Sequence, residues 1–315
     1  RVRRREIPLV KPSGMEGFVF NTRRPLFQDR RVRRALALAF DYNWVNRTYY
    51  AGQMKRITSF FSGSALGFTD PAPAPERALL EPFAETLPRE ALQRGWRPPR
   101  YEDARERRAA LSEARALLRE AGWSVRDGVL RNATGALFEF EILIDQRRHE
   151  RVARSFADDL EWLGVRAVVR LVDQAQRTHR ARIYDYDMLV FRWNFSLSPG
   201  QEQKYYFGAA LRDEPGTRNY MGMAEPAVDA MVDALLSARD RPTFETAVRA
   251  YDRALSWGVF VIPWGWRTED WIAHDAVLRI PERTASAGFI LDAVWRADVT
   301  EADAARADAT PEGER

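Results

Sequence analysis

The stretch LFEFEILIDQRRHERVARSFADDLEWLGVRAVVRLV, residues 137–172, contains two apolar runs separated by a helical pattern. The runs 137–144 and 165–172 have the length and the branched or aromatic content of strands. Between them, 147–164 follows a helical pattern and ends at a glycine, Gly164. A strand, a helix and a strand in this order predict a βαβ unit with parallel strands.

The same alternation continues on both sides of this unit. Helices are predicted at 30–40, where Asp29 caps the first turn, and at 42–50, 109–122, 226–237 and 244–257. A further helix follows the strand 165–172 and ends near residue 182. Strands are predicted at 17–21, 188–191 and 259–264, and the proline-rich connectors 70–75 and 95–100 enclose an irregular surface excursion. The order predicts an α/β fold with a largely parallel sheet.

Composition limits the possible classes of protein. The 315 residues are 45% hydrophobic, enough for a sizeable core, and 49 basic against 45 acidic residues leave a net charge of only +4. The arginine runs 1–5 and 30–34 are flanked by acidic residues and accompany no nucleic-acid-binding motif, so we expect no nucleic-acid partner. The absence of cysteine excludes disulfides, and no apolar stretch has the length of a membrane span.

A group of recognition-type side chains follows the predicted strand 188–191. Because ligands of open α/β sheets bind beyond the carboxyl ends of strands, residues placed there project toward a ligand. They are Arg192, Trp193, Asn194, Ser196 and Ser198, which offer a guanidinium, an indole wall, an amide and two hydroxyls. The alternative interpretation is that Trp193 is a core residue and Arg192 a member of a surface ion pair.

Three segments carry a resemblance to a known family. They are GFVFNTRRPLFQDRRVRRALALAFDYNWVNRTYYAGQMKR (17–56), DMLVFRWNFSLSPGQEQ (187–203) and PGTRNYMG with EPAVDAMVD (215–233), with weaker support from WGVFVIPWGW (257–266). In this order they resemble the carboxyl-terminal half of a family 5 solute-binding protein, the extracytoplasmic receptor of an oligopeptide ABC importer, of the YejA type.

The resemblance implies an α/β fold of the periplasmic-binding-protein type II class, with one lobe, crossing segments and part of the second lobe. The implied domains are a crossing segment at 1–24, a ligand-closing lobe at 25–257, a return segment at 258–295 and a flexible tail at 296–315. The amino-terminal lobe and any signal peptide are expected to precede residue 1. We therefore expect 258–295 to lack part of its packing partner.

The resemblance also implies a ligand site. Asn21, Arg23, Asn219 and Tyr220 lie in the segments that carry it and complete the predicted ligand-binding residues. Receptors of this family often place an aspartate shortly after the cleft tryptophan, where it pairs with the α-amino group of a peptide. Here Asn194, Phe195 and Ser196 follow Trp193, so recognition of a free amine by that position is not expected.

Catalytic and metal-binding motifs are not found in the sequence. His149, His179 and His274 are scattered without metal-ligand spacing, and there is no nucleophile elbow or phosphate-binding glycine loop. We therefore predict neither metal nor cofactor and no enzymatic activity. Trp257, Trp264, Trp266 and Trp271 leave two alternatives open: an oligosaccharide receptor of the same fold, or a glycosidase-like enzyme, against the simpler interpretation that these rings pack around the last strand.

The predicted function is that of a monomeric periplasmic receptor. It binds oligopeptide-like ligands by closure of two lobes and delivers them to the permease subunits of an ABC importer in the inner membrane.

Overall fold

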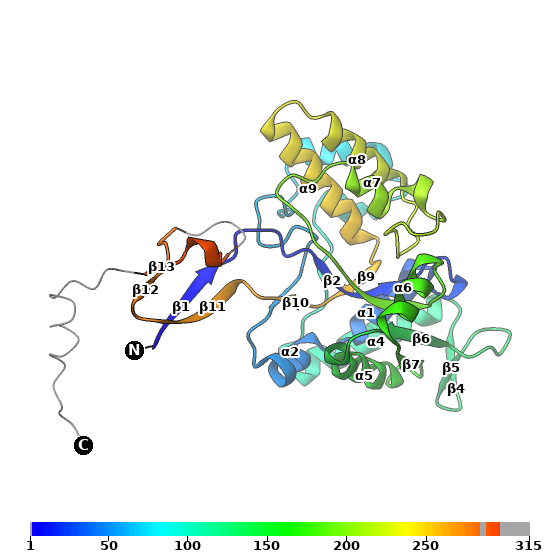
Figure 1. Cartoon of the computed structure of the whole chain (residues 1–315). Coiled ribbons are helices and arrows are strands. Elements are labelled where there is room, and N and C mark those ends of the chain that lie inside the picture. The colour runs from blue at the N-terminus through cyan, green and yellow to red at the C-terminus, as the bar shows by residue number, and fades with distance from the viewer. Residues whose placement is uncertain (1, 284–287, 297–315) are drawn as a thin grey trace, which may run out of the picture. The chain divides into compact units, whose positions relative to one another are not determined.

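The computed structural model describes residues 2–283 and 288–296, which form two units (Figure 1). The larger unit comprises 12–266, and the smaller combines the described residues of 1–11 and 267–315. The chain therefore passes between the units twice, near 11/12 and near 266/267. The predicted lobe boundaries at 24/25 and 257/258 stay a prediction. Apart from Arg296, the predicted tail lies outside the described residues.

A five-stranded sheet forms the centre of the larger unit, in the order β7-β6-β8-β2-β9. The strands are β2 (Met15–Phe20), β6 (Glu139–Ile144), β7 (Arg166–Leu171), β8 (Met188–Trp193) and β9 (Val261–Pro263). β6 pairs in parallel with β7 and β8, whereas β2 pairs antiparallel with β8 and β9. The sheet is mixed, so the prediction of a largely parallel sheet is wrong beyond β7-β6-β8.

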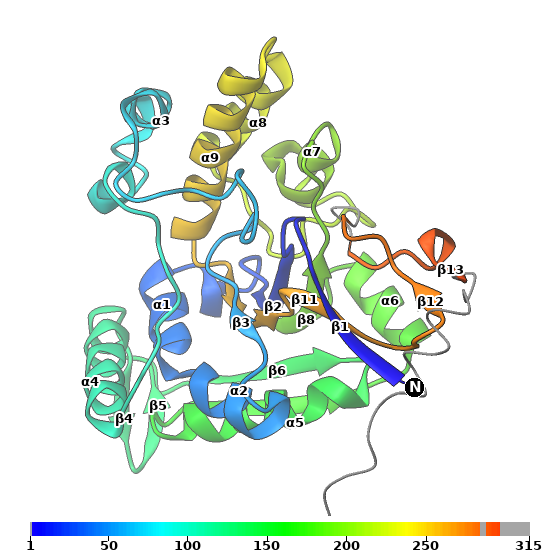
Figure 2. The same ribbon diagram turned by 90° about the vertical axis from the view of Figure 1, so that its left-hand side faces the viewer.

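Helices lie on both sides of this sheet, as Figures 1 and 2 show. On one side are α1 (Arg30–Ala39), α4 (Ala104–Glu120) and α5 (Arg147–Glu161), with α2 (Tyr42–Tyr50) nearby. On the other are α6 (Gln174–Arg182), α7 (Glu202–Phe207), α8 (Pro226–Ser237) and α9 (Arg241–Trp257), with α3 (Ala74–Leu80) beside α9. Two short antiparallel pairs complete the unit: β4 (Ser124–Arg126) with β5 (Val129–Arg131), and β3 (Lys55–Arg56) with β10 (Gly265–Trp266).

Aspartates define where many of these helices begin. A side-chain carboxylate at the N-cap accepts hydrogen bonds from free backbone N–H groups of the first turn. Asp29, Asp41, Asp103, Asp173 and Asp240 act in this way at α1, α2, α4, α6 and α9. The predicted cap at Asp29 is confirmed, and α8 begins with Pro226, as predicted.

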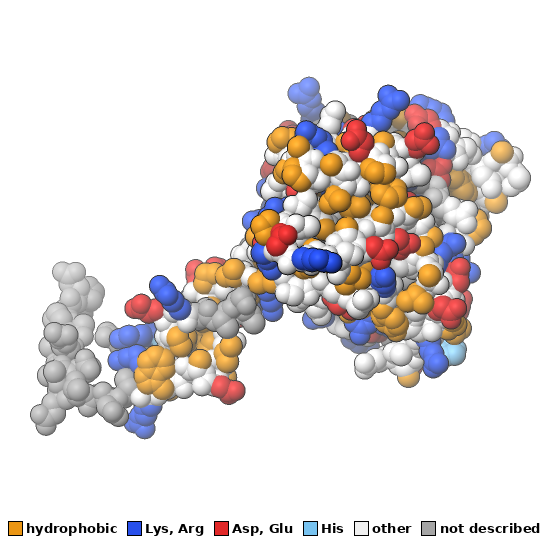
Figure 3. All heavy atoms as spheres, turned by 90° about the horizontal axis from the view of Figure 1, so that it is seen from above, with side chains coloured by type: hydrophobic (Ala, Val, Ile, Leu, Met, Phe, Trp, Pro, Cys, Tyr) orange, Lys and Arg blue, Asp and Glu red, His pale blue; other side chains and the backbone are white. Residues whose placement is uncertain are grey.

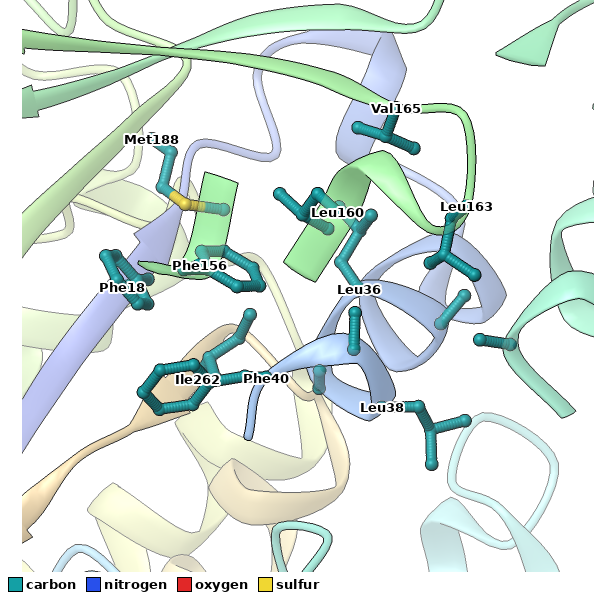
Figure 4. Close-up of a cluster of buried hydrophobic side chains, with 14 of the residues drawn as sticks. Phe18, Leu36, Leu38, Phe40, Phe156, Leu160, Leu163, Val165, Met188 and Ile262 are labelled. Atoms are coloured by element: carbon teal, nitrogen blue, oxygen red, sulfur yellow. The ribbon is translucent and has the colours of Figure 1, made fainter. Parts of the chain in front are cut away.

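The core between the sheet and α1 and α5 is rich in aromatic rings (Figure 4). Phe18 of β2 stacks on Phe156 of α5 with ring centroids 4.6 Å apart, and Phe40 meets both rings edge-on. Burying a ring of this kind contributes about 1.5–3 kcal/mol. These contacts hold α5 against β2, two strands away from β6, the strand that precedes α5.

The proline-rich stretch between 70 and 100 is better ordered than the sequence predicts. It contains α3, and Leu80 and Ala91 are buried. The fully buried guanidinium of Arg253, in α9, pairs with Asp70 at 3.2 Å and with Glu76 at 3.3 Å. This anchor lies far away along the chain, so the local pattern could not indicate it.

The smaller unit is built on β1 (Val2–Pro8), paired antiparallel with β11 (Glu269–Asp275), and on β12 (Leu278–Arg279), paired with β13 (Trp295–Arg296). Exposed apolar side chains in it include Trp271, Leu291 and Trp295. For these residues the expected loss of packing partners stays a prediction. It is wrong for the strand 259–263, because β9 is buried within the larger unit.

The surface carries charges of both signs. Seen from above, basic and acidic side chains are interspersed with apolar ones over the larger unit (Figure 3). None of the helices in the described parts of the chain is both long and apolar enough to cross a membrane.

Candidate functional site

The order of the parallel strands reverses at β6. The chain runs from β6 through α5 to β7 on one side, and from β7 through α6 to β8 on the other. α5 packs on the face that holds Phe18, whereas Arg177 of α6 lies over Phe191, which points to the opposite face. Segments that leave adjacent strands toward opposite faces open a crevice at the carboxyl ends, where ligands of such sheets bind.

The pairing between β6 and β8 is short. They pair at Ile142↔Met188 and Leu143↔Leu189, whereas β6 and β7 pair along the whole of both strands. β8 then continues to Trp193 beside β2, beyond its last pairing with β6. The edge of β8 that faces β6 is therefore free of strand pairing at its carboxyl end.

Four charged side chains and one histidine from three segments lie at this edge, and we call them the carboxyl-edge cluster: Glu16, Asp145, Arg148, His149 and Arg192. Glu16 lies opposite Arg192 in the β2–β8 pairing, and its carboxylate accepts from Arg192 Nη1 at 3.0 Å. The other carboxylate oxygen lies 3.7 Å from His149 Nε2. Arg148 Nε donates to the same nitrogen at 3.1 Å. The cluster therefore bridges the strand-order reversal.

His149 is buried within the cluster, with 6% of its surface exposed. Desolvation, reinforced by the neighbouring Arg148, lowers the pKa of His149 to about 4. The imidazole is therefore neutral near pH 7, and since Nε2 accepts from Arg148, the proton resides on Nδ1. Among the described residues, Nδ1 has no hydrogen-bond partner.

The depressed pKa of His149 predicts a loss of stability in acid. An unfolded histidine takes up its proton near pH 6.5, whereas the folded one does so only near its pKa of about 4. The folded state is therefore penalised as the pH falls through this window, by up to about 3 kcal/mol. We therefore expect the free energy of unfolding, measured with denaturant, to fall less between pH 7 and pH 4.5 for His149→Gln than for the wild type.

A matched control for this measurement is His179→Gln, at an exposed position on α6. This variant should lose as much unfolding free energy between pH 7 and pH 4.5 as the wild type does. Identical pH profiles for His149→Gln and the wild type would show that the buried imidazole is not the cause.

Five of the predicted site residues lie at or directly after the carboxyl end of β8. The strand extends two residues beyond its predicted end, so Arg192 and Trp193 are its last residues. The Arg192 side chain is 43% exposed, donates to Ser13 O at 3.1 Å and to Asn194 Oδ1 at 3.0 Å, and pairs with Glu16. Ser196 and Ser198 are exposed, and the Ser198 backbone N–H donates to Ser196 Oγ.

Trp193 is fully buried. Its ring lies between Phe191 and Phe207, with centroids at 4.8 and 5.7 Å, and its Nε1 donates to Arg218 O at 3.3 Å. Tyr220 lies beside the same group, 4.5 Å from the Phe191 ring, and is partly exposed under Arg177. The surroundings of Trp193 match the core interpretation of this residue, and a binding role for it stays a prediction.

Asn21, Arg23 and Asn219 lie together at the opposite end of β8. Asn21 follows Phe20, which pairs with Met188, the first residue of β8. Its side-chain amide donates to the carbonyls of Tyr184 and Tyr186, and Arg23 donates to Asn219 O at 3.0 Å. The nine predicted residues therefore do not form one cluster, and ligand contacts by this second group stay a prediction.

Sequence reasoning missed Glu16, Asp145 and Arg148, and treated His149 only as a scattered histidine. Asp145 could have been found, because it follows a predicted strand directly, by the rule that selected Arg192. Glu16 could not, since its place depends on the antiparallel pairing of β2 with β8. Within the described residues, no group of three or more His, Cys, Asp or Glu side chains could hold a metal ion.

Comparison with known families gives one match, to the model of bacterial extracellular solute-binding proteins, family 5 Middle, over residues 4–213. This match covers more than half of the chain.

Curated relatives match most of the chain. A Brucella melitensis protein, provisionally named a binding protein, is 41% identical over 90% of this chain and 46% of its own length. In Agrobacterium fabrum, "Peptidoglycan-binding protein YepA" is 38% identical over 91% of this chain and 47% of its own, and "Probable peptide-binding protein YejA" is 37% identical over 94% and 48%. The chain spans about half the length of these relatives.

Solved structures share the fold at low identity. The oligopeptide-binding protein AppA of Bacillus subtilis, in complex with a nonapeptide, matches with a TM-score of 0.65 and 16% identity, over 94% of this chain and 53% of AppA. NikA of Brucella suis, in complex with Fe(III)-EDTA, matches with a TM-score of 0.66 over the same shares, also at 16% identity. The α/β fold of solute-binding proteins, expected from the resemblance, is confirmed.

Proposed function

The chain belongs to the bacterial extracellular solute-binding proteins of family 5, and from that premise we propose that it forms part of a receptor for peptide-like ligands. The family consists of binding proteins rather than enzymes, so the glycosidase alternative is set aside. The receptor would act in the periplasm and deliver its ligand to the permease subunits of an ABC importer.

The carboxyl-edge cluster is the observation that carries this proposal. It lies at the carboxyl ends of the strands, where α/β sheets bind ligands, and presents guanidinium and carboxylate groups together. Groups of both signs suit a ligand with both an amine and a carboxylate, as a peptide has. The names of the Agrobacterium relatives and the nonapeptide bound to AppA agree with this class of ligand.

Three of the four tryptophans named above favour a peptide over an oligosaccharide, whereas Trp271, in β11 of the smaller unit, is 41% exposed. A sugar-binding site needs an accessible indole face, but Trp257, Trp264 and Trp266 are only 8%, 5% and 4% exposed. Trp257 is further held by a hydrogen bond from Nε1 to Arg94 O at 2.7 Å. These rings serve the packing of the larger unit.

Closure of two lobes is the proposed mechanism. The chain passes between its two units at two places, so a rotation would require backbone change at only a few residues near 11/12 and 266/267. Sealing a ligand in this way removes most of its surface from water.

Arg192→Lys tests the proposal. Lysine retains the charge but loses the planar fork that binds a carboxylate at two points. We expect full-length protein carrying this change to bind a pool of random tetrapeptides roughly tenfold more weakly, since a hydrogen bond to a charged group contributes about 1.5–3 kcal/mol. Equilibrium dialysis with mass-spectrometric detection measures the retained peptides, and the carboxyl-amidated pool should be less affected.

Arg154→Lys is the matched control, because Arg154 is exposed on α5 and, among the described residues, forms an ion pair only with Glu150. Equal affinities of both variants and the wild type would remove Arg192 from the site. Retention of neither pool by the wild type would contradict the peptide class itself.

A further inference from the structure

A cavity of about 340 Å³ opens on the larger unit, and no residue of the carboxyl-edge cluster lines it. Its walls come from α1, α4, the last residue of α9 and the proline-rich segment, at residue 70 and at 90–99. Small-molecule sites are typically concave and measure about 300–1,000 Å³. The size of this cavity and its construction from separate stretches of chain fit such a site.

Hydrogen bonds between the stretches hold the walls of this cavity in place. Trp257 Nε1 donates to Arg94 O at 2.7 Å, which joins the end of α9 to the segment 90–99. The Gly95 backbone N–H donates to Asp70 Oδ1, also at 2.7 Å. A ligand would therefore meet a preformed site, and little ordering of the protein would oppose binding.

Part of the wall is apolar. Trp96 and Pro99 are half-buried, so each keeps some surface open to a ligand. Leu38 and Trp257, each 8% exposed, add apolar surface that is nearly closed to water. An indole beside a proline ring offers flat apolar contacts of the kind that aromatic rings prefer.

The Asp70 carboxylate at the cavity is fully occupied by the protein itself. Its Oδ1 accepts from Gly95 N and from Arg253 Nη1, and its Oδ2 accepts from Nε and Nη2 of Arg97. These hydrogen bonds fill the roughly four acceptor sites that a carboxylate has. Asp70 therefore has no capacity left for a ligand.

Guanidinium N–H groups, by contrast, remain available. The exposed Arg94 side chain forms no hydrogen bond or ion pair among the described residues. Arg34 bonds Glu113 through Nη2 alone, at 2.6 Å, and the Glu90 carboxylate is the one on the cavity wall without a partner in the described parts of the chain. Because each guanidinium carries five N–H donors, the unused donors outnumber the unused acceptors, and this favours an anion.

We propose that this cavity is a second ligand site, which takes a small carboxylate with a flat aromatic ring. The ring lies against Trp96 and Pro99, and the carboxylate accepts hydrogen bonds from Arg94. The proposal does not depend on the peptide ligand or on lobe closure, since every wall residue belongs to 12–266.

The test uses full-length protein and three probes that share one ring system: naphthoate, the neutral naphthamide and the cationic naphthylmethylamine. Calorimetric titration should show that the wild type binds naphthoate roughly tenfold more tightly than naphthamide, because hydrogen bonds to charged groups are the stronger ones. The amine should bind most weakly. Arg94→Gln should lower the affinity for naphthoate alone, to that for naphthamide. This variant retains the backbone carbonyl that Trp257 contacts, and thermal melts establish that it is folded.

Arg89→Gln is the matched control, because Arg89 is exposed in the same segment but does not line the cavity. It should bind all three probes as the wild type does. Hydrogen exchange gives a second readout: naphthoate should slow exchange in 90–99 and leave 137–172 unchanged.

Three results would overturn the proposal. They are the absence of naphthoate binding, equal binding of naphthoate by Arg94→Gln and the wild type, and tightest binding of the amine, which would assign the recognition to Glu90 instead. The peptide receptor would stand in each case, since its test uses other probes and another residue.

Discussion

Replacing Trp193 by alanine should unfold the larger unit at a markedly lower temperature. The side chain is fully buried, contacts Phe191 and Phe207, and donates a hydrogen bond to Arg218 O. Loss of a buried tryptophan costs about 3–5 kcal/mol because a cavity remains. We expect the melting temperature to fall by roughly 6–20 °C, at ~2–4 °C per kcal/mol in a chain of this size.

Trp162→Ala is the control, since Trp162 is 64% exposed at the end of α5. The melting temperature of this variant should stay close to that of the wild type. An unchanged melting temperature for Trp193→Ala, together with weaker peptide binding, would instead place the indole in the ligand site.

Replacing Arg253 by leucine should destabilise the chain by a similar amount. Its guanidinium is completely buried between Asp70 and Glu76, and the Glu76 side chain is only 2% exposed. Removing the cation leaves Glu76 as an unpaired buried acid, whose pKa burial already raises, and breaking such a pair costs about 3–5 kcal/mol. We expect a lower melting temperature and earlier proteolysis within 70–100 than elsewhere in 12–266.

Arg239→Leu, at an exposed position, separates charge removal from loss of the buried pair and should have little effect. The double variant Arg253→Leu with Glu76→Leu should recover much of the loss, because no unpaired charge remains. A melting temperature of Arg253→Leu equal to that of the wild type would mean that the ion pairs do not hold the 70–100 segment in place.

Local signals predict individual elements of this fold well. Asp29 and Pro226 mark helix starts by local chemistry, and the βαβ unit of β6, α5 and β7 follows from its periodicity. The direction of a strand cannot be predicted from local signals, because nothing in residues 17–21 indicates that β2 runs antiparallel to β8. The order of 70–100 likewise depends on Arg253, more than 150 residues later.

The candidate site could be predicted only in part, for the same reason. A residue after a buried strand can be selected from the sequence, and this rule finds Arg192 and Asn194. Asn21 ends a predicted strand and Arg23 follows it, but the antiparallel direction of β2 places both at the opposite end of β8. Glu16 joins the cluster through a cross-strand pair, which no local pattern specifies.

The brief pairing of β6 with β8 has a consequence for temperature. Because this strand pairing is short, aromatic packing does much of the work of holding the two parts of the sheet together: Phe156 lies on Phe18, and Phe27 contacts both Phe20 and Phe140. Apolar cohesion weakens on cooling, whereas the ladder between β2 and β8 does not depend on it in the same way. The junction between β6 and β8 should therefore loosen in the cold before either part of the sheet does.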